Sequence, residues 1–386
     1  MSSIHVDKVD LATYLATVAS TAPTDLQPYF EKFRTQHDRK LWHQLTLTLE
    51  DFLNQPASAP YQIDLFNNFV RDFESKLNQL RLVQIAVKSS KQFERPDDML
   101  EFLTDLLSRL SKTDASEAYV MLLSSLAHAK LLFGDAEGTR VDIEESGKIL
   151  DQLDDVDPIV HGAYYSVSAD YYKARAEYVP YYKNSLLYLA CVNPEADLSV
   201  DERVTRAHDL GVSALLGETI YNFGELLIHP ILDSLDGSRH AWLKELLFVF
   251  NEGNIGKFEA LGPQLPREPL LQESYSFLRQ KICLMALIEA VFKRNAHKRT
   301  MTFQIIAEET KLPKDEVEHL IMKALSLKLI RGEIDQVDET VNIDWVQPRV
   351  LSRPRIGQLA DKLTLWIGRL EKVDEFVKSN SKLFSA

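Results

Sequence analysis

Apolar residues recur at intervals of three and four along most of the chain, and short turn signals divide these runs into pairs. One run consists of Tyr119, Leu122, Leu126, Ala129 and Phe133. Gly134 and Asp135 then predict a turn, and a second run starts at Ile143. Such spacing places apolar side chains on one face of a helix, so neighbouring helices must pack together to bury them. The pattern predicts an N-terminal solenoid of antiparallel helix pairs, similar to tetratricopeptide-type repeats but without their strict period.

The composition favours a mostly helical chain. Glycine accounts for 14 and proline for 15 of the 386 residues, below the usual shares of ~7% and ~5%. Hydrophobic residues make up 45% and charged residues 26%, which is the balance of a globular chain rather than a disordered or fibrous one. Because domains usually span about 100–200 residues, we expect two or three folding units.

Eight of the fourteen tyrosines lie between Tyr164 and Tyr188. Interleaved with basic residues such as Arg175, they could form a platform on which nucleic-acid bases stack. Tyr164, Tyr171 and Tyr178, however, follow one another at seven-residue intervals, which predicts a single helix face. Aromatic packing between helices explains this spacing more simply, and we favour it.

A different pattern begins near residue 299. Residues 299–302 predict a short strand, and Thr302 can cap the helix that follows. Leu312 and Pro313 predict a turn before a second short helix, whose apolar face consists of Val317, Leu320, Ile321, Ala324 and Leu327. Residues 329–335 and 341–346 alternate between polar and apolar and predict two strands joined by an acidic turn. Two short helices followed by a two-stranded ribbon are typical of a winged helix.

The ribbon of this winged helix offers an unpaired strand edge to a neighbouring protein. We expect an interface there that consists of Leu329, Arg331, Ile334, Val341, Ile343 and Trp345. The competing interpretation is that the second helix reads nucleic acid in a major groove. Its three lysines are offset by three acidic residues, and the turn of the ribbon adds three more acidic residues. A groove-reading face should be net basic, so the charge favours protein binding.

The net charge of the chain is 44 − 57 = −13, which argues against binding to a phosphate backbone. The one basic run consists of Lys293, Arg294, His297, Lys298 and Arg299. It could contact phosphate, but the C-terminus of a helix and a solvated linker explain it better. We therefore expect no nucleic-acid partner.

The chain ends in a heptad pattern. After Pro348 and Pro354, seven apolar residues follow at gaps of three and four: Ile356, Leu359, Leu363, Trp366, Leu370, Val373 and Val377. This seam predicts one long helix over three heptads. The helix could pack onto its own domain. Because it stands at the chain end behind two prolines, we expect it instead to bury its seam in a bundle with helices of other chains.

No signature of catalysis, cofactor binding or metal binding occurs in the sequence. There is no GxSxG, HExxH, GxxxxGK[ST] or GxGxxG pattern. No two of the ten histidines show metal-ligand spacing with a carboxylate, and Asp154, Asp155 and Asp157 lack the glycine of a calcium-binding loop. We expect no catalytic, cofactor-binding or metal-binding residues. An enzyme with a non-local active site stays an alternative. It would show a deep polar pocket with several mutually close titratable groups, and we expect none.

Two cysteines, Cys191 and Cys283, lie far apart within apolar helical stretches. We expect both to be buried and unreactive, as in a reducing compartment. Residues 1–10 are polar, so we expect no signal peptide. The longest apolar stretch, residues 282–292, contains Glu289 and is shorter than the ~18–20 residues of a membrane span. We expect a cytoplasmic or nuclear protein without a membrane partner.

Helical repeats, a winged helix and a terminal helix, in this order, resemble the PCI domain family. That family is shared by the proteasome lid, the COP9 signalosome and translation initiation factor three. The local sequence resembles a PCI subunit of the proteasome lid most at residues 181–190 (YYKNSLLYLA), 223–230 (FGELLIHP), 306–313 (IAEETKLP), 317–335 and 345–351 (WVQPRVL). The resemblance covers most of the chain from about Tyr164 onward.

The resemblance implies a fold of four parts: a helical-repeat region at 1–172, the helical part of a PCI domain at 173–296, its winged-helix part at 297–348 and a C-terminal bundle helix at 349–386. It implies a non-catalytic scaffold subunit of the lid, in the cytoplasm and nucleus, that supports lid assembly and ubiquitin-dependent protein degradation. Its partners would be other PCI subunits and, through the helix bundle, the lid deubiquitinase subunits. The deubiquitinase motif contains His-x-His, which this chain lacks. The alternative is a PCI subunit of the signalosome or of a translation initiation factor, with RNA contact as an option.

Overall fold

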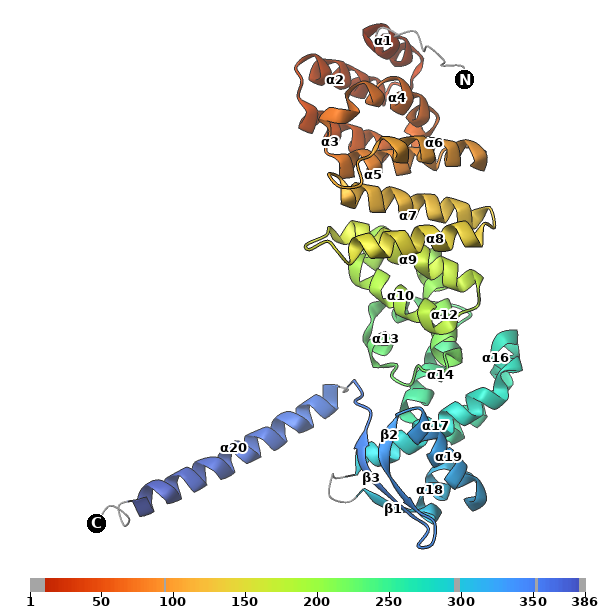
Figure 1. The fold of residues 1–386 in the computed structure, drawn as a ribbon, viewed down its shortest axis with the longest axis vertical. Helices are drawn as coiled ribbons and strands as arrows, with labels where there is room; N and C mark the ends of the chain where they lie inside the picture. The colour runs from red at the N-terminus through yellow and green to blue at the C-terminus, as the bar shows by residue number, and fades with distance from the viewer. Residues whose placement is uncertain (1–10, 94, 295–298, 351–352, 382–386) are drawn as a thin grey trace. The chain divides into compact units, whose positions relative to one another are not determined.

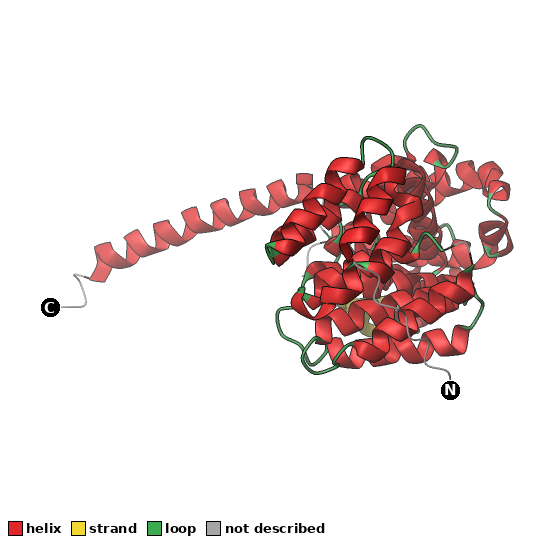
Figure 2. Cartoon of the chain, turned by 90° about the horizontal axis from the view of Figure 1, so that it is seen from above, coloured by secondary structure: helices red, strands yellow, loops and turns green. Residues whose placement is uncertain are grey.

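A computed structural model describes residues 11–93, 95–294, 299–350 and 353–381 (Figure 1). The chain divides into two compact units, Met1–Leu198 and Ser199–Ala386. Helices dominate the regular structure of the described residues (Figure 2), and the strands belong to one small sheet in the second unit. The predicted fold, a helical solenoid followed by a PCI domain, is confirmed. The four predicted domain boundaries stay a prediction.

The first unit is built from antiparallel helices around one large apolar core. Its α-helices are α1 (Leu11–Thr21), α2 (Gln27–Asp38), α3 (Trp42–Leu53), α4 (Gln62–Asn68), α5 (Gln79–Ser90), α6 (Pro96–Arg109), α7 (Ser116–Leu132), α8 (Ala136–Leu150), α9 (Pro158–Ala174), α10 (Tyr178–Cys191) and α11 (Pro194–Asp197). Two 3-10 helices, η1 (Pro56–Tyr61) and η2 (Val70–Lys76), flank α4. Phe30 and Phe33 of α2 and Phe52 of α3 are fully buried in mutual edge-to-face contact. Aromatic packing therefore joins α2 to α3.

The predicted turn between α7 and α8 is confirmed. Gly134 adopts a left-handed φ of 83°, which glycine tolerates best. The side chain of Asp135 accepts a hydrogen bond from the backbone N–H of Gly138, 2.9 Å away, and so caps α8. Asp157 caps α9 in the same way by accepting from the N–H of Ile159. Asp157, which belongs to the acidic cluster of the sequence, therefore serves as the N-cap of α9.

The prediction that Tyr164, Tyr171 and Tyr178 share one helix face is wrong. The helix α9 ends at Ala174, and Tyr178 begins α10. Ala176 makes the turn between them with a left-handed φ of 56°. Alanine adopts this conformation rarely. The sequence marks the break only by Pro180, which lies in the first turn of α10 and cannot continue the hydrogen bonding of α9.

The second unit begins with a helical layer. Its elements are α12 (Val200–Leu216), α13 (Gly224–Ile228), η3 (Pro230–Leu235), α14 (Ala241–Glu252), α15 (Ile255–Leu261), η4 (Gly262–Arg267), α16 (Pro269–Glu273) and α17 (Tyr275–Lys293). Lys281 of α17 is buried, and its Nζ donates hydrogen bonds of 2.6–3.0 Å to the carbonyls of Ala214, Leu215 and Gly217. Those carbonyls lie at the C-terminal end of α12, so the amino group of Lys281 satisfies acceptors that a helix leaves without partners.

A winged helix follows, as predicted. It consists of β1 (Thr300–Thr302), α18 (Phe303–Thr310), α19 (Lys314–Ser326), β2 (Ile330–Asp335) and β3 (Thr340–Val346). The sheet order is β1-β3-β2, with both pairs antiparallel. The hydroxyl of Thr302 accepts from the N–H of Ile305 and caps α18 as predicted. Gly332 lies at a bulge in β2, where any Cβ would collide with the carbonyl of Asn342.

The last element is α20 (Arg353–Ser381), one continuous helix in Figures 1 and 2. It confirms the long helix predicted from the heptad pattern. Across the described ranges, no helix combines the length and the apolar character that a membrane span requires.

Candidate protein-interface sites

The helix α20 carries an apolar seam that its own chain leaves uncovered. The side chains of the seam are each between 47% and 59% exposed: Ile356, Leu359, Leu363, Trp366, Leu370, Val373 and Val377. A soluble chain rarely exposes so many large apolar residues in one continuous row unless a partner covers them. The burial of this seam in a bundle with other chains stays a prediction.

Further apolar residues widen this surface beyond the predicted seam. Leu365, Ile367 and Phe376 are between 55% and 67% exposed. At 3.6 residues per turn, Leu365 and Phe376 lie roughly a third of a turn from the seam. A helix with apolar residues on more than one side is suited to a position between several helices rather than to a two-helix contact.

The segment that leads into α20 is tied to the second unit by a buried ion pair. Nη1 of Arg349 lies 2.7 Å from Oε2 of Glu289 in α17, and the two side chains are 5% and 8% exposed. Nη2 of Arg349 donates to the backbone carbonyl and to the side-chain oxygen of Asn251, at 2.6 and 2.8 Å. Val350 packs against Gly224, where any Cβ would collide with it. These contacts hold the chain in place up to residue 350.

The ribbon of the winged helix places its predicted interface residues in two groups. Leu329, Val341 and Ile343 are at most 3% exposed and belong to the core of the winged helix itself. Arg331 is exposed, while Ile334 and Trp345 are partly exposed. The guanidinium of Arg331 lies 4.8 Å from the centre of the Trp345 ring, in cation–π contact. The side chains that remain available to a partner are therefore Arg331, Ile334 and Trp345, and the interface stays a prediction.

The face of α19 carries less free positive charge than its lysines suggest. Lys314 pairs with Glu339 of the ribbon turn, and Lys323 donates a 2.9 Å hydrogen bond to Gln280 of α17. Lysines that serve contacts within the chain are less available to phosphate groups. These contacts engage two of the three lysines, and protein binding by this winged helix stays a prediction.

The tyrosine cluster is used in helix packing. Tyr171, Tyr181 and Tyr182 are between 4% and 8% exposed. Arg175 donates a hydrogen bond to the hydroxyl of Tyr171 at 2.9 Å and pairs with Glu177 at 3.0 Å. Buried rings cannot stack on bases, so the burial of these three rings supports the packing interpretation, while the other five tyrosines of the cluster are partly exposed.

The two cysteines differ in burial. Cys283 is buried as predicted, and desolvation raises the pKa of its thiol to about 11. Cys191 is only partly buried, so the prediction of full burial is wrong for that residue. Desolvation also raises the pKa of Cys191. A raised pKa keeps both thiols protonated and weakly nucleophilic.

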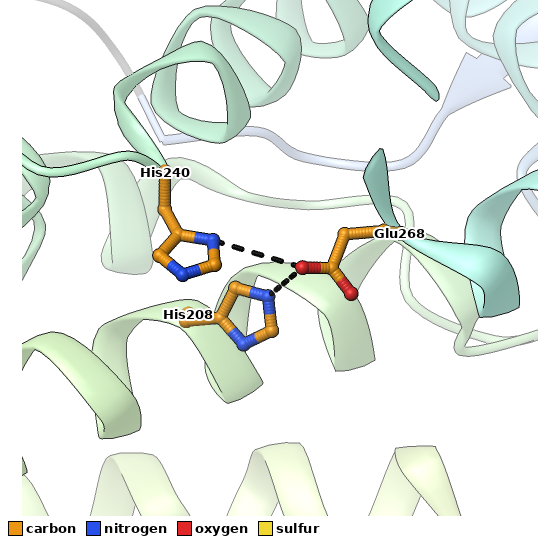
Figure 3. Close-up of side chains that lie close together, drawn as sticks. All are labelled: His208, His240 and Glu268. Carbon is orange, nitrogen blue, oxygen red and sulfur yellow. Dashed lines mark hydrogen bonds and ion pairs between the residues drawn. The ribbon is translucent and has the colours of Figure 1, made fainter. Parts of the chain in front are cut away.

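A cluster of two histidines and a glutamate lies in the second unit, where the sequence predicted no such group (Figure 3). Oε1 of Glu268 is 2.8 Å from Nε2 of His208 and 3.7 Å from Nδ1 of His240. The cluster lines a pocket of about 450 Å³ together with Asp201, Val204, Thr205 and Arg239. The structure thus brings together titratable groups that the sequence did not predict beside a polar pocket. The residues lie too far apart in the sequence for any local motif to reveal them.

The two imidazoles differ in their proton affinity. Burial lowers the pKa of His208, but hydrogen bonds with Asp209 and Glu268 outweigh burial, so that the pKa of His208 is raised overall. Burial and then the positive charge of His208 lower the pKa of His240. The ring centres of His208 and His240 are only 4.3 Å apart, so protonation of both rings at once is energetically unfavourable.

Comparison with known proteins identifies the family. The family described as PSD13 N-terminal repeats matches residues 29–247, and the PCI domain matches residues 261–345. The chain belongs to the PSD13 family. A relative named probable 26S proteasome regulatory subunit rpn9, from Schizosaccharomyces pombe, is 40% identical over 374 residues, which cover 97% of each chain. The resemblance to a PCI subunit of the proteasome is confirmed.

Two further relatives differ in how much of this chain they match. A protein named 26S proteasome non-ATPase regulatory subunit 13 homolog A, from Arabidopsis thaliana, is 40% identical over 369 residues, 92% of this chain and 94% of the relative. Eukaryotic translation initiation factor 3 subunit M from Aedes aegypti is 38% identical over only 82 residues, 21% of each chain. The PSD13 relatives match nearly end to end, whereas the initiation factor shares a short segment.

Proposed function

We propose that this chain is a non-catalytic scaffold subunit of the lid of the 26S proteasome regulatory particle, acting in the cytoplasm and nucleus. Family membership across nearly the whole chain supports the assembly, because the full-length relatives are named as 26S proteasome regulatory subunits. Their names describe regulation rather than catalysis, and the sequence lacks the His-x-His of the lid deubiquitinase. Supporting lid assembly would make the chain a contributor to ubiquitin-dependent protein degradation.

The exposed apolar surface of α20 is the observation that carries the proposal. Its seam residues are about half exposed in the isolated chain, and burying one large apolar side chain contributes roughly 1.5–3 kcal/mol. In the proposed assembly the seam is buried among helices of other PCI subunits and of the deubiquitinase subunits. The ribbon of the winged helix supplies the second contact, through the edge of β2 and the side chains of Arg331, Ile334 and Trp345.

The test of this mechanism replaces two seam residues by aspartate. Leu363→Asp with Leu370→Asp should abolish incorporation into the lid, because two carboxylates cannot be buried in an apolar bundle without partners. The fold of the rest of the chain should not change, since both side chains are exposed. Native gel electrophoresis of assembled lids measures incorporation, and circular dichroism measures the fold.

A matched control places the same charges on the opposite face of α20. Thr364→Asp with Gly368→Asp adds two aspartates where the helix is polar, and a Cβ at Gly368 meets no neighbouring atom. This control should assemble normally. Normal assembly of the Leu363→Asp, Leu370→Asp variant would refute the bundle mechanism, as would equal loss in both variants.

The alternative function is that of a PCI subunit in a translation initiation factor, with contact to RNA. The 82-residue match to initiation factor 3 subunit M is the observation in its favour. An RNA shift assay at moderate salt separates the two functions. The net charge of −13 predicts no tight binding, whereas tight binding with a steep salt dependence would favour the initiation factor.

A further inference from the structure

The cluster of His208, His240 and Glu268 joins three separate segments of the second unit. His208 lies within α12, His240 directly precedes α14, and Glu268 lies between η4 and α16 (Figure 3). The three side chains are between 13% and 19% exposed. One potential ligand atom from each residue can be chosen so that all three lie within 4.8 Å of one another. Three side chains from distant segments thus converge on one point beside a pocket.

We propose that His208, His240 and Glu268 bind a divalent transition-metal ion, with Zn²⁺ as the best match. Two imidazoles and one carboxylate are a ligand set that zinc uses at sites with an open coordination position. Two ligands of a tetrahedral zinc ion, each at about 2.1 Å, lie about 3.4 Å apart. The measured separations from Oε1 of Glu268, 2.8 and 3.7 Å, lie on either side of that value. The three ligand atoms together span up to 4.8 Å, so the side chains must move closer to hold one ion.

The contact between Asp209 and His208 orients the first ligand. Oδ1 of Asp209 lies 3.2 Å from Nδ1 of His208, and in the tautomer that carries its proton on Nδ1 the ring donates to this carboxylate. The lone pair of Nε2 then points at Oε1 of Glu268, 2.8 Å away. Two lone pairs at that distance repel unless a cation lies between them. A proton can fill this position, and so can a metal ion, whose charge would also offset the two carboxylates.

The exposed side chain of Arg239 opposes metal binding in the metal-free form. Its Nε donates a 2.8 Å hydrogen bond to Nε2 of His240, which leaves the proton of the neutral ring on Nδ1. For Nδ1 to bind a metal ion, that proton must move to Nε2 and Arg239 must turn away. Arg239 also places a positive charge at the edge of the pocket. The geometry therefore predicts that removal of Arg239 strengthens metal binding.

The test uses the purified full-length chain, freed of metal with a chelator and titrated with zinc chloride in a calorimeter. Wild type should bind one Zn²⁺ per chain. Glu268→Gln and His240→Ala should each weaken the affinity for zinc at least tenfold. Asp209→Asn should weaken it about tenfold or more, because the carboxylate of Asp209 orients His208. Arg239→Gln should tighten binding several-fold. Co²⁺ should show the intense visible absorption of a four-coordinate ion in wild type, and Glu268→Gln should lose it.

His319→Ala is the control variant. His319 lies on the exposed side of α19, outside the cluster, so its removal should leave the zinc affinity unchanged. Circular dichroism of Glu268→Gln, which preserves side-chain shape, confirms that lost binding is not lost folding. The proposal is overturned if wild type binds no stoichiometric zinc. It is equally overturned if Glu268→Gln and His240→Ala retain the affinity of wild type, because the ion would then bind elsewhere.

Discussion

Arg349 and Glu289 form an ion pair that is almost completely withdrawn from water, with 2.7 Å between Nη1 and Oε2. Glu289 lies in the apolar stretch of α17, and Arg349 lies in the segment between β3 and α20. A buried charge is costly without a partner. The pair therefore makes the position of residue 349, from which the C-terminal helix departs, depend on a specific contact within the second unit.

Arg349→Met should lower the free energy of unfolding by about 3 kcal/mol, because Glu289 would lose its buried partner. The double variant with Glu289→Met should recover most of this loss, since no charge is then left in the apolar surroundings. Urea unfolding followed by circular dichroism measures both values.

Arg140→Met provides the comparison for the Arg349 variant. Arg140 pairs with Glu144 at 3.3 Å on the exposed surface of α8, where an ion pair contributes less than about 0.5 kcal/mol. If Arg349→Met costs no more than Arg140→Met, the buried pair does not stabilise the second unit in the way described.

Lys281→Met should lower the free energy of unfolding by about 2 kcal/mol near pH 8. The variant leaves the carbonyls of Ala214, Leu215 and Gly217 without their buried donor. Lys257→Met is the control, because Lys257 lies on the surface and pairs with Glu252 there. Equal stabilities of the two variants would contradict this role of Lys281.

The same lysine should make stability depend on pH. Burial lowers the pKa of Lys281 from its usual 10.5 to about 7. Between these values the unfolded chain binds more protons than the folded chain, so stability rises with pH. The advantage of wild type over Lys281→Met should therefore grow from pH 7 toward about 10.5 and stay constant below pH 7. An advantage that shrinks over this window would show that the folded state prefers the charged ammonium.

Trp345→Ala should weaken incorporation into the lid at least tenfold while it changes the unfolding free energy little. Trp345 is partly exposed beside Arg331, and tryptophan and arginine are frequent energetic centres of protein interfaces. Glu333→Ala, at an exposed position of β2, should assemble like wild type. Lid pull-down at several chain concentrations gives the comparison, and unchanged assembly of Trp345→Ala would remove the ribbon from the interface.

Local signals made the winged helix and the terminal helix predictable from sequence. Thr302 caps α18, Leu312 and Pro313 separate two short helices, and alternation marks both strands. The heptad seam extends through α20 without interruption. Each of these features depends on neighbours within a few residues, which a sequence displays directly.

Features that depend on distant partners were not predictable. The turn at Ala176 contains no glycine, and Pro180 follows it only within the first turn of α10, so the tyrosine spacing extended across the break. Half of the predicted ribbon interface is buried because alternating residues of a strand face their own core, as Val341 does. His208 and Glu268 are 60 residues apart, and only the packing of α12 against later segments brings them together.

Native affinity purification of the tagged chain, with quantitative mass spectrometry of the proteins that co-elute, tests the central claim most directly. The account predicts lid and base subunits of the 26S proteasome at near-equal stoichiometry to the chain. It also predicts that the Leu363→Asp, Leu370→Asp variant loses these subunits. Recovery of translation initiation factor or signalosome subunits in their place would contradict the proposed function, even though the PCI fold would stand.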